Sequence, residues 1–429
     1  MMRRCSRIGF GRAAAGALAA VLALPLASPG AVPTPAAVEE VLSQVSGPRA
    51  YGHVLELSQK IGPHVAGSRQ DRPAGAYIAG QLEKDGYGVE WQPFQFPFFG
   101  VRAIALSVPS APAVVLHPNV MVYSPSTVDG GITAQVVDIG LGGLDDVRAK
   151  PPVGKIALIL RGGMTFAEKV KNAGDAGALA AIIYNAQAGD LRGVVGRGAK
   201  IPAVSLSGVD GERLLTLVRA GPLTVHLNVQ TVDEQRTTWN IIATKPGTRD
   251  AHRVVVVGAH RDTVEGAPGA NDNTSGVATA LEVAEVLRGV PLALTVRFVF
   301  FGEEEYGLYG SEYYVHHMGA DPVVGMVDLD MEGVGEKLQL ARDKGSDELV
   351  HTAAAVAERL GIKVTVQPSG GSDHQSFEAV GVPTVFILRP DDPYYDTPKD
   401  TVDRVDPNLL AVSARLATAV VLDVAGAGR

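Results

Sequence analysis

The sequence predicts an α/β protein whose mostly parallel central sheet is flanked by helices. Two observations predict this class. Beyond Thr237, apolar strand-like runs alternate regularly with helix-like segments, and this alternation is typical of a parallel sheet covered on both faces. Residues 119–234 differ, because short strands there surround one clear helix, Thr165–Ala176. We therefore expect this block to be a small β-rich domain inserted into the α/β domain.

Local patterns justify the individual elements. The pattern over residues 37–82 is helical, and a helix over Arg72–Asp85 ends before Gly86, a residue type that often follows a helix. Val89–Val108 is rich in Phe and β-branched residues and predicts strands. The inserted block contributes short strands at Gln135–Ile139, Lys155–Leu160, Ala181–Tyr184 and Ala203–Leu206. The last part contributes strands at Val254–Gly258, Thr295–Phe301, Val323–Asp328 and Thr384–Leu388, and helices at Thr274–Arg288, Asp347–Leu360 and Pro407–Val424.

Composition bounds the class of protein. The chain has 429 residues, 46% of them apolar, which is enough for a large core and for more than one domain. A formal charge of −8 argues against a nucleic-acid backbone as a partner. Because Cys5 is the only cysteine, we expect no disulfide, and any metal would be held by His, Asp and Glu.

The first 31 residues have the order of a secretory signal peptide. Four arginines precede an apolar stretch, Ala13–Ala27, which small residues and prolines follow. A membrane anchor is the weaker alternative, because a spanning helix needs about 20 apolar residues. We therefore expect export to the periplasm or the extracellular space, removal of residues 1–31, and no membrane span in the mature chain.

Four motifs place acidic or imidazole side chains at the ends of strand-like runs or at the starts of helices. They are GAHRDT (Gly258–Thr263), GANDNTSG (Gly269–Gly276), GEEEYGLYGS (Gly302–Ser311) and LDMEG (Leu329–Gly333). In an open α/β sheet, ligands bind outside the carboxyl ends of the strands. One His and several carboxylates at that edge are the composition of a two-metal hydrolase.

The first two motifs each contain a candidate ligand. His260 follows a strand directly, and Asp262 lies two positions on, where a carboxylate would orient the imidazole of a metal ligand. A solvated turn is an equally good interpretation of this motif alone. Asp272 precedes a helix, so the alternative role is capping, for which Thr274 or Ser275 would suffice. The start of a helix also favours an ionised Asp272 that bridges two cations.

The other two motifs add carboxylates at strand ends. Glu303–Glu305 follow a strand, and adjacent carboxylates repel each other unless a positive charge compensates them. A surface charge run is the alternative, but it fits poorly with the buried-strand pattern that precedes them. Asp330 is flanked by apolar residues, so it should be neutral or paired, and a metal would supply the partner.

Together the motifs resemble the co-catalytic dizinc exopeptidases, a family that includes secreted bacterial aminopeptidases and glutamate carboxypeptidases. The inserted block is similar to the family's protease-associated (PA) domain, notably at Gly154–Arg161, Lys169–Gly174 and Ile201–Ser205. The resemblance implies a zinc exopeptidase fold, with a catalytic domain at 32–118 and 235–429 and the PA-like insert at 119–234. It also implies a peptide substrate and two divalent metal ions.

The resemblance implies a role for each residue that matches a family motif. His260 and Asp330 would hold one zinc ion. Asp272 would bridge both metals, and Glu305 would hold the second. Glu304, the first of the Glu-Glu pair before Tyr-Gly-Leu, would be the general base.

The last motif departs from the family. Tyr395 matches the residue that steadies the tetrahedral oxyanion, but Asp396 stands where the family has a His ligand. We therefore expect Asp396 to be a ligand of the second metal. An all-oxygen second site suits a harder ion such as Mn²⁺ better than an imidazole-containing site does, so that ion is zinc or a harder one. His374 lies in a loop that the family uses near the substrate.

The sequence therefore predicts a secreted metallo-exopeptidase. Among the exopeptidases, we favour an aminopeptidase that acts through metal-activated water. A carboxypeptidase or dipeptidase is the first alternative. It would need a cation for the terminal carboxylate of its substrate, and Arg389 and Arg342 are the candidates. A non-catalytic binding protein on the same fold is the second alternative, and the intact Glu304 argues against it.

Overall fold

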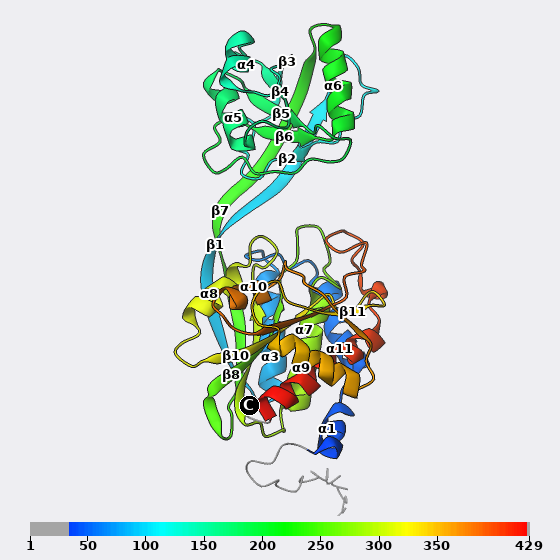
Figure 1. Ribbon diagram of the computed structural model, residues 1–429. Coiled ribbons are helices and arrows are strands. Elements are labelled where there is room, and N and C mark those ends of the chain that lie inside the picture. The colour runs from blue at the N-terminus through cyan, green and yellow to red at the C-terminus, as the bar shows by residue number, and fades with distance from the viewer. Residues whose placement is uncertain (1–33, 427–429) are drawn as a thin grey trace, which may run out of the picture.

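The computed structural model describes residues 34–426, which form two bodies joined by a two-stranded ribbon (Figure 1). The ribbon consists of β1 (Gly88–Ser107) and β7 (Thr224–Lys245), which pair antiparallel along most of their length. The segment between these strands forms the smaller body at the far end of the ribbon (Figure 1). The predicted limits of the insert, 119 and 234, remain a prediction, because both strands run on from one body into the other.

A mixed sheet forms the centre of the larger body, in the order β12-β11-β13-β10-β8-β9-β7, with β1 paired to β7. Its central strands are parallel, as the sequence predicts. They are β8 (Asp250–His260), β9 (Leu294–Phe301), β10 (Val323–Asp330) and β13 (Thr384–Leu388). Antiparallel neighbours flank them, β7 beside β9 and β11 (Leu338–Ala341) beside β13, and β12 (Val364–Val366) lies at one edge. The predicted α/β class is thus confirmed.

Alternation along β8 explains why helices cover both faces of this sheet. Val255 and Val257 belong to the main core, whereas Val254 and Val256 pack with Tyr314 and other residues on the opposite face. Successive strand residues point to opposite faces, so each face has its own helices. The main core is covered by α3 (Asp71–Lys84), α7 (Thr274–Leu287), α9 (Glu348–Arg359) and α11 (Pro407–Val421). The opposite face is covered by α8 (Tyr309–His317) and α10 (His374–Ala379).

Short helical segments complete the body: α1 (Pro35–Leu42), α2 (Gly47–Val54), η1 (Leu55–Ile61), η2 (Val402–Arg404) and η3 (Leu422–Gly426).

Within residues 34–426, one helical stretch, Pro407–Gly426, is long and apolar enough to cross a membrane by length and composition alone. Most of its apolar window is buried within the protein, where Leu416 and Val420 pack in the main core. It is therefore a core helix. The predicted signal peptide, residues 1–31, lies outside the described residues.

The insert has a small parallel sheet and two apolar cores of its own. Its strands β3 (Ile132–Asp138), β4 (Ile156–Leu160), β5 (Ala180–Tyr184) and β6 (Ala203–Leu206) are parallel neighbours in sequence order, and β2 (Asn119–Val120) pairs with β6. Helix α5 (Phe166–Asp175) matches the predicted helix. Two further helices, α4 (Leu144–Ala149) and α6 (Gly208–Ala220), are additions to the prediction.

Candidate metal centre

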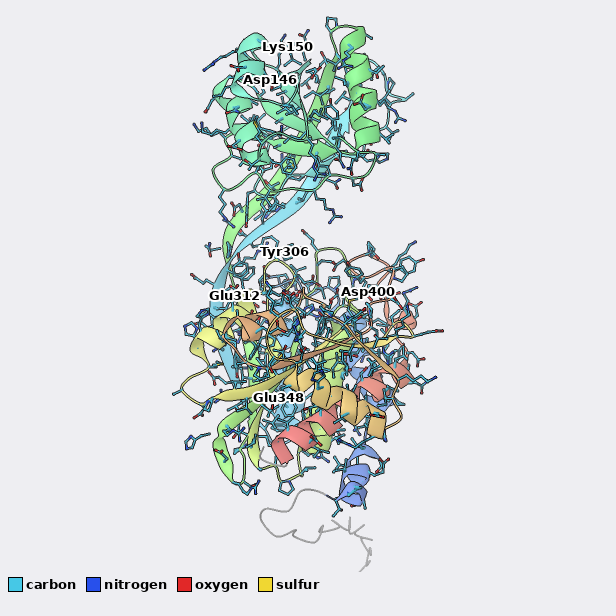
Figure 2. The ribbon with its side chains drawn as sticks, in the orientation of Figure 1. Asp146, Lys150, Tyr306, Glu312, Glu348 and Asp400 are labelled. Carbon is cyan, nitrogen blue, oxygen red and sulfur yellow. The ribbon has the colours of Figure 1, made fainter. Side chains whose placement is uncertain are left out.

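The motif residues meet where three neighbouring strands of the larger body end. His260 is the last residue of β8 and pairs with Phe301, the last residue of β9. Asp330 is the last residue of β10, which lies on the other side of β8. The Glu304-Glu305 pair follows β9 by a few residues. Tyr306, directly after this pair, lies on the side of the larger body that faces the insert (Figure 2).

The imidazole of His260 is surrounded by carboxylates. Its Nε2 atom lies 3.2 Å from Asp272 Oδ1, 3.5 Å from Asp330 Oδ1 and 3.9 Å from Glu304 Oε2. Two sets of side chains bring potential ligand atoms within 4.8 Å of one another: His260 with Asp272 and Glu305, and His260 with Glu304 and Asp330. The structure therefore brings together five of the residues that the motifs single out.

The polar atoms of this cluster fit a bound cation. Among the described residues, His260 Nδ1, Glu305 Oε1 and Asp330 Oδ1 are buried without a hydrogen-bond partner. Buried polar atoms normally have partners. One imidazole and several carboxylate oxygens are the donors that zinc and manganese accept in proteins. The donor set and its unpartnered atoms are thus those of a divalent metal centre.

Electrostatics lead to the same conclusion. Burial and the nearby Asp330 raise the pKa of Asp272 to about 7. Burial also raises the pKa of Glu304 and Glu305 well above the usual range. Burial lowers the pKa of His260, but the carboxylates of Glu304 and Asp330 outweigh it and raise that pKa well above its usual value. Acids packed this closely need positive charge, which a divalent ion supplies.

Asp262 links two of the motifs. Its Oδ1 lies 3.7 Å from His260 Nδ1, beyond normal hydrogen-bond length. The same carboxylate accepts hydrogen bonds from the backbone amides of Glu304 (3.0 Å) and Glu305 (3.4 Å). Burial raises the pKa of Asp262, yet the contacts with His260 and with the Glu304 amide hold it below its usual range. Asp262 therefore orients the glutamate loop as well as facing the imidazole.

Asn273 caps helix α7, a role for which the sequence suggested Thr274 or Ser275. Its side chain accepts from Gly276 N (2.9 Å) and from Met331 N (3.2 Å), and donates to Leu329 O (2.9 Å). Asn273 therefore ties the segment of Asp272 to the end of β10. Asparagine is a preferred capping residue, so its position before the helix was a usable indication.

Asp400 holds the Asp272 segment from the opposite side. It is fully buried and accepts hydrogen bonds from Asn271 N (2.8 Å) and Asp272 N (3.0 Å). Burial raises the pKa of Asp400 to about 6. The Asn271 side chain in turn donates to Asp392 Oδ2 (3.0 Å). The sequence analysis missed these residues, because their contacts span more than 100 positions and no local pattern indicates them.

Tyr395 and Asp396 lie at the margin of this centre. Tyr395 is 49% exposed, and Asp396 is exposed with a positive φ of 58°. Burial of its carboxyl and the nearby Asp330 raise the pKa of Asp396, so its carboxylate lies within electrostatic range of the cluster. Asp396 is in neither set of ligand atoms described above. Its role as a ligand stays a prediction.

His374 and Arg389, the two predicted substrate contacts, lie inside the fold, and their role towards a substrate stays a prediction. His374 is fully buried, with Nδ1 3.1 Å from Asp328 Oδ2 and Nε2 3.1 Å from Ser369 O. Arg389 is 2% exposed and donates to the backbone oxygens of Glu332 (3.2 Å) and Gly335 (3.2 Å). Both side chains are used inside the fold, which favours structural roles.

Glu303 differs from the two glutamates that follow it. It is fully buried, neither of its carboxyl oxygens has a hydrogen-bond partner among the described residues, and it belongs to neither set of ligand atoms. Burial raises its pKa to about 10. The surroundings of Glu303 therefore favour the neutral form of its carboxyl group.

Comparison with known proteins identifies both bodies. Residues 240–421 match the model of peptidase family M28, and residues 123–214 match the PA domain. The aminopeptidase YwaD of Bacillus subtilis is 33% identical over 393 residues, which are 87% of this chain and 84% of that protein.

Two solved structures resemble the whole chain. An aminopeptidase from Aneurinibacillus sp. strain AM-1 has a TM-score of 0.76 and 34% identity, covering 90% of this chain and 96% of that one. BSAP, a zinc aminopeptidase from Bacillus subtilis, has a TM-score of 0.73 and 31% identity, covering 89% and 96%. The family resemblance drawn from the motifs is thus confirmed. The chain belongs to peptidase family M28 and is a metallo-exopeptidase that carries a PA domain.

Proposed function

We propose that this protein is a zinc-dependent aminopeptidase that removes residues from the amino termini of peptides. The convergence of Asp272, Glu304 and Asp330 on His260 Nε2, within 3.2 to 3.9 Å, is the observation that carries the proposal. The aminopeptidase names of YwaD and of the two structural neighbours support the choice of exopeptidase type.

The metal-binding residues would divide between two ions. His260 and Asp330 would hold the first, for which zinc is expected. Glu305 would hold the second, and Asp272 would serve both. The proximity of Asp272 and Asp330 to the same imidazole nitrogen supports this division. Bound zinc polarises a carbonyl oxygen and makes water more acidic.

Glu304 would act as the general base. Its side chain lies beside His260, and its backbone amide is fixed by Asp262. The carboxylate would take a proton from the attacking water and return it to the leaving amine, as general acid–base catalysis requires. Tyr395 would stabilise the oxyanion from its exposed loop, which would have to close over the substrate.

The surroundings of the two candidate arginines support the choice of an aminopeptidase over a carboxypeptidase. Such an enzyme needs a free cation for the terminal carboxylate of its substrate. Arg389 is buried with internal partners, and Arg342 pairs with Asp347 at 2.5 Å. Arg389 is therefore used inside the fold, and Arg342 takes part in a surface ion pair.

Asp396 would complete the second metal site. Because its carboxylate lies outside the two sets of ligand atoms, the loop around it would have to move closer when metal binds. Asp396→Ala should then lose one metal equivalent, whereas Asp396→His should keep two. Metal content of the dialysed proteins measures this, and two tightly bound ions in the Ala variant would exclude Asp396 as a ligand.

A substrate panel tests the activity itself. Free, amino-blocked and carboxyl-blocked peptides should be compared with and without a chelator, and zinc should then be added back. We expect hydrolysis of free and carboxyl-blocked peptides only, its loss on chelation and its return with zinc. Hydrolysis of amino-blocked peptides, or full activity without metal, would refute the proposal.

Export is part of the proposal. The arginines and apolar stretch of residues 1–31 support a signal peptide. Expression of the full chain in a bacterium that secretes proteins should give a product that begins near residue 32 outside the cytoplasm. Amino-terminal sequencing of that product would test it.

A further inference from the structure

A buried amide in strand β7 closes the base of the loop that carries the Glu304-Glu305 pair. Asn240 is fully buried. Its Oδ1 accepts a hydrogen bond from Gly302 N (3.1 Å), and its Nδ2 donates to Gly310 O (2.8 Å). These two glycines flank the loop. One side chain therefore holds both of its ends.

The two ends of the loop approach each other so closely that glycine is required. A Cβ atom at Gly310 would lie 2.1 Å from Gly302 O and 2.7 Å from Asn240 Oδ1. Inside the loop, Tyr309 N donates to Glu303 O at 2.9 Å. Without the Asn240 amide, the Gly302 N–H would be buried without a partner, which is costly, and the carbonyl of Gly310, in the first turn of α8, would lose one of its hydrogen bonds.

Asn240 also connects the loop to the ribbon that carries the insert. Its Nδ2 donates a second hydrogen bond to Gln92 Oε1 (2.9 Å), and Gln92 lies directly opposite Asn240 in the pairing of β1 with β7. The amide thus joins both ribbon strands to the glutamate loop. Both hydrogens of Nδ2 and one acceptor position of Oδ1 are used.

Aromatic rings make a second connection between the ribbon and this loop. Three Phe residues that alternate on one face of β1 each contact one Tyr from the loop or from α8. The pairs are Phe94–Tyr313, Phe96–Tyr309 and Phe98–Tyr306, with ring centroids 5.3, 6.3 and 5.7 Å apart. Tyr306 follows Glu305 directly, and its hydroxyl also accepts from Glu265 N (3.3 Å).

We propose that Asn240, in ribbon strand β7, is a positioning residue. Its hydrogen bonds fix the positions of Glu304 and Glu305 relative to the ribbon. This inference rests on the proposed function, in which Glu305 binds metal and Glu304 moves a proton. Asp262 fixes the middle of the loop, because its carboxylate accepts hydrogen bonds from the backbone amides of both glutamates. Asn240 fixes the two ends of the loop. A shift of about 1 Å in a catalytic group can cost about 10²-fold in rate.

Replacement of Asn240 by Ala tests the proposal. We expect kcat to fall about 10- to 100-fold and KM to change little, because the loss affects the reacting groups more than the substrate contacts. Zinc affinity should also fall about 10- to 100-fold, which is typical when a group that orients a metal ligand is removed. Affinity is measured by competition with a chelating dye, without any substrate.

Asn185→Ala is the matched control. Asn185 is a buried asparagine in the insert, and its side chain donates to Gly189 O (2.9 Å) and Asp190 O (3.0 Å) and accepts from Arg161. Its loss removes a similar set of hydrogen bonds far from the glutamate loop. Stability should fall in both variants, whereas zinc affinity and kcat should fall only in Asn240→Ala. Equal zinc affinities in the two variants would overturn the proposal.

Two further outcomes keep the test decisive. If the wild-type protein binds zinc but cleaves no peptide, the proposed function fails, while the ratio of zinc affinities still decides the role of Asn240. If Asn240→Ala does not fold, Gln92→Leu replaces it, because it removes only one partner of the amide. A drop of about 3- to 10-fold in zinc affinity is then expected, and an unchanged affinity would overturn the proposal.

Discussion

Both bodies bring acidic side chains to the carboxyl ends of parallel strands, but the two sets of acids have different surroundings. In the insert, a hollow of about 550 Å³ is lined by residues that follow β3 and β4, among them Asp145, Asp146 and Glu168. Asp146 lies at the end of the insert remote from the larger body (Figure 2). In the larger body, the corresponding edge carries the cluster around His260.

The difference lies in the hydrogen-bond partners. In the insert, Asp146 accepts from Gly143 N (2.9 Å), and Glu168 accepts from Thr165 N (2.9 Å) and Thr165 Oγ1 (2.7 Å). In the larger body, oxygens of Glu305 and Asp330 are buried without partners among the described residues. Acidic residues at the carboxyl ends of strands therefore indicate a metal centre only when the fold leaves their buried oxygens without hydrogen-bond partners.

The largest expected effect is on catalysis, and one substitution made in both bodies tests it. Glu304→Gln should lower kcat about 10²- to 10⁴-fold with metal content unchanged, because an amide cannot accept the proton of water. Glu168→Gln should leave kcat within about twofold, because this residue only caps a helix in the insert. Turnover of an aminoacyl chromogenic substrate measures both. Near-normal turnover by Glu304→Gln would assign the base to another group.

A smaller effect is expected on the pH dependence of stability. Burial raises the pKa of Glu332 to about 8, whereas an unfolded Glu titrates near about 4.3. Between these values the folded state holds a proton that the unfolded state has lost, so stability falls as pH rises, by at most about 1.4 kcal/mol per pH unit. Glu332→Gln removes this pH dependence. The free energy of unfolding of the variant should therefore rise relative to that of the wild type as pH increases from about 5 to about 8.

Urea unfolding of the metal-free proteins, followed by Trp fluorescence, measures this gain. The two tryptophans of the chain, Trp91 and Trp239, both pack against the core of the larger body, so the insert does not contribute. Glu168→Gln is the control, because its contacts with Thr165 lower the pKa of Glu168 but the residue lies in the insert, so the Trp-detected stability of this variant should follow that of the wild type at every pH. A constant difference between Glu332→Gln and wild type would show that Glu332 does not titrate in this window.

Periodic elements were predictable from the sequence, and long-range contacts were not. The helix predicted over Thr274–Arg288 is α7, Thr274–Leu287, and the strand predicted over Val323–Asp328 is β10, Val323–Asp330. Apolar periodicity specifies such elements locally. Strands β11 and β12 have only four and three residues, too few for a period to be recognised.

The residues of the candidate site also fall into those that a local motif indicates and those that only long-range contacts place there. His260, Asp272, Glu304 and Asp330 could be found because each belongs to a motif at the end of an element. Asn240 could not, because it lies within a strand 62 positions before Gly302 and 70 before Gly310. The family resemblance of its loop placed His374 near the substrate, but its contact with Asp328, 46 positions away, was not predictable from any local pattern.

The smallest expected effect concerns Thr165, which provides the hydrogen-bond partners of Glu168 in the insert. Thr165 caps α5 from the position before its first residue, where its hydroxyl accepts from Glu168 N and its backbone amide donates to the Glu168 carboxylate. Thr165→Ala should lower the stability of the insert by about 1 kcal/mol, as loss of a helix cap usually does. Hydrogen exchange over residues 165–176 should become faster, while Trp fluorescence and turnover stay unchanged. A tenfold loss of kcat would instead mean that the strand-edge acids of the insert support the metal centre, and the contrast between the two bodies would disappear.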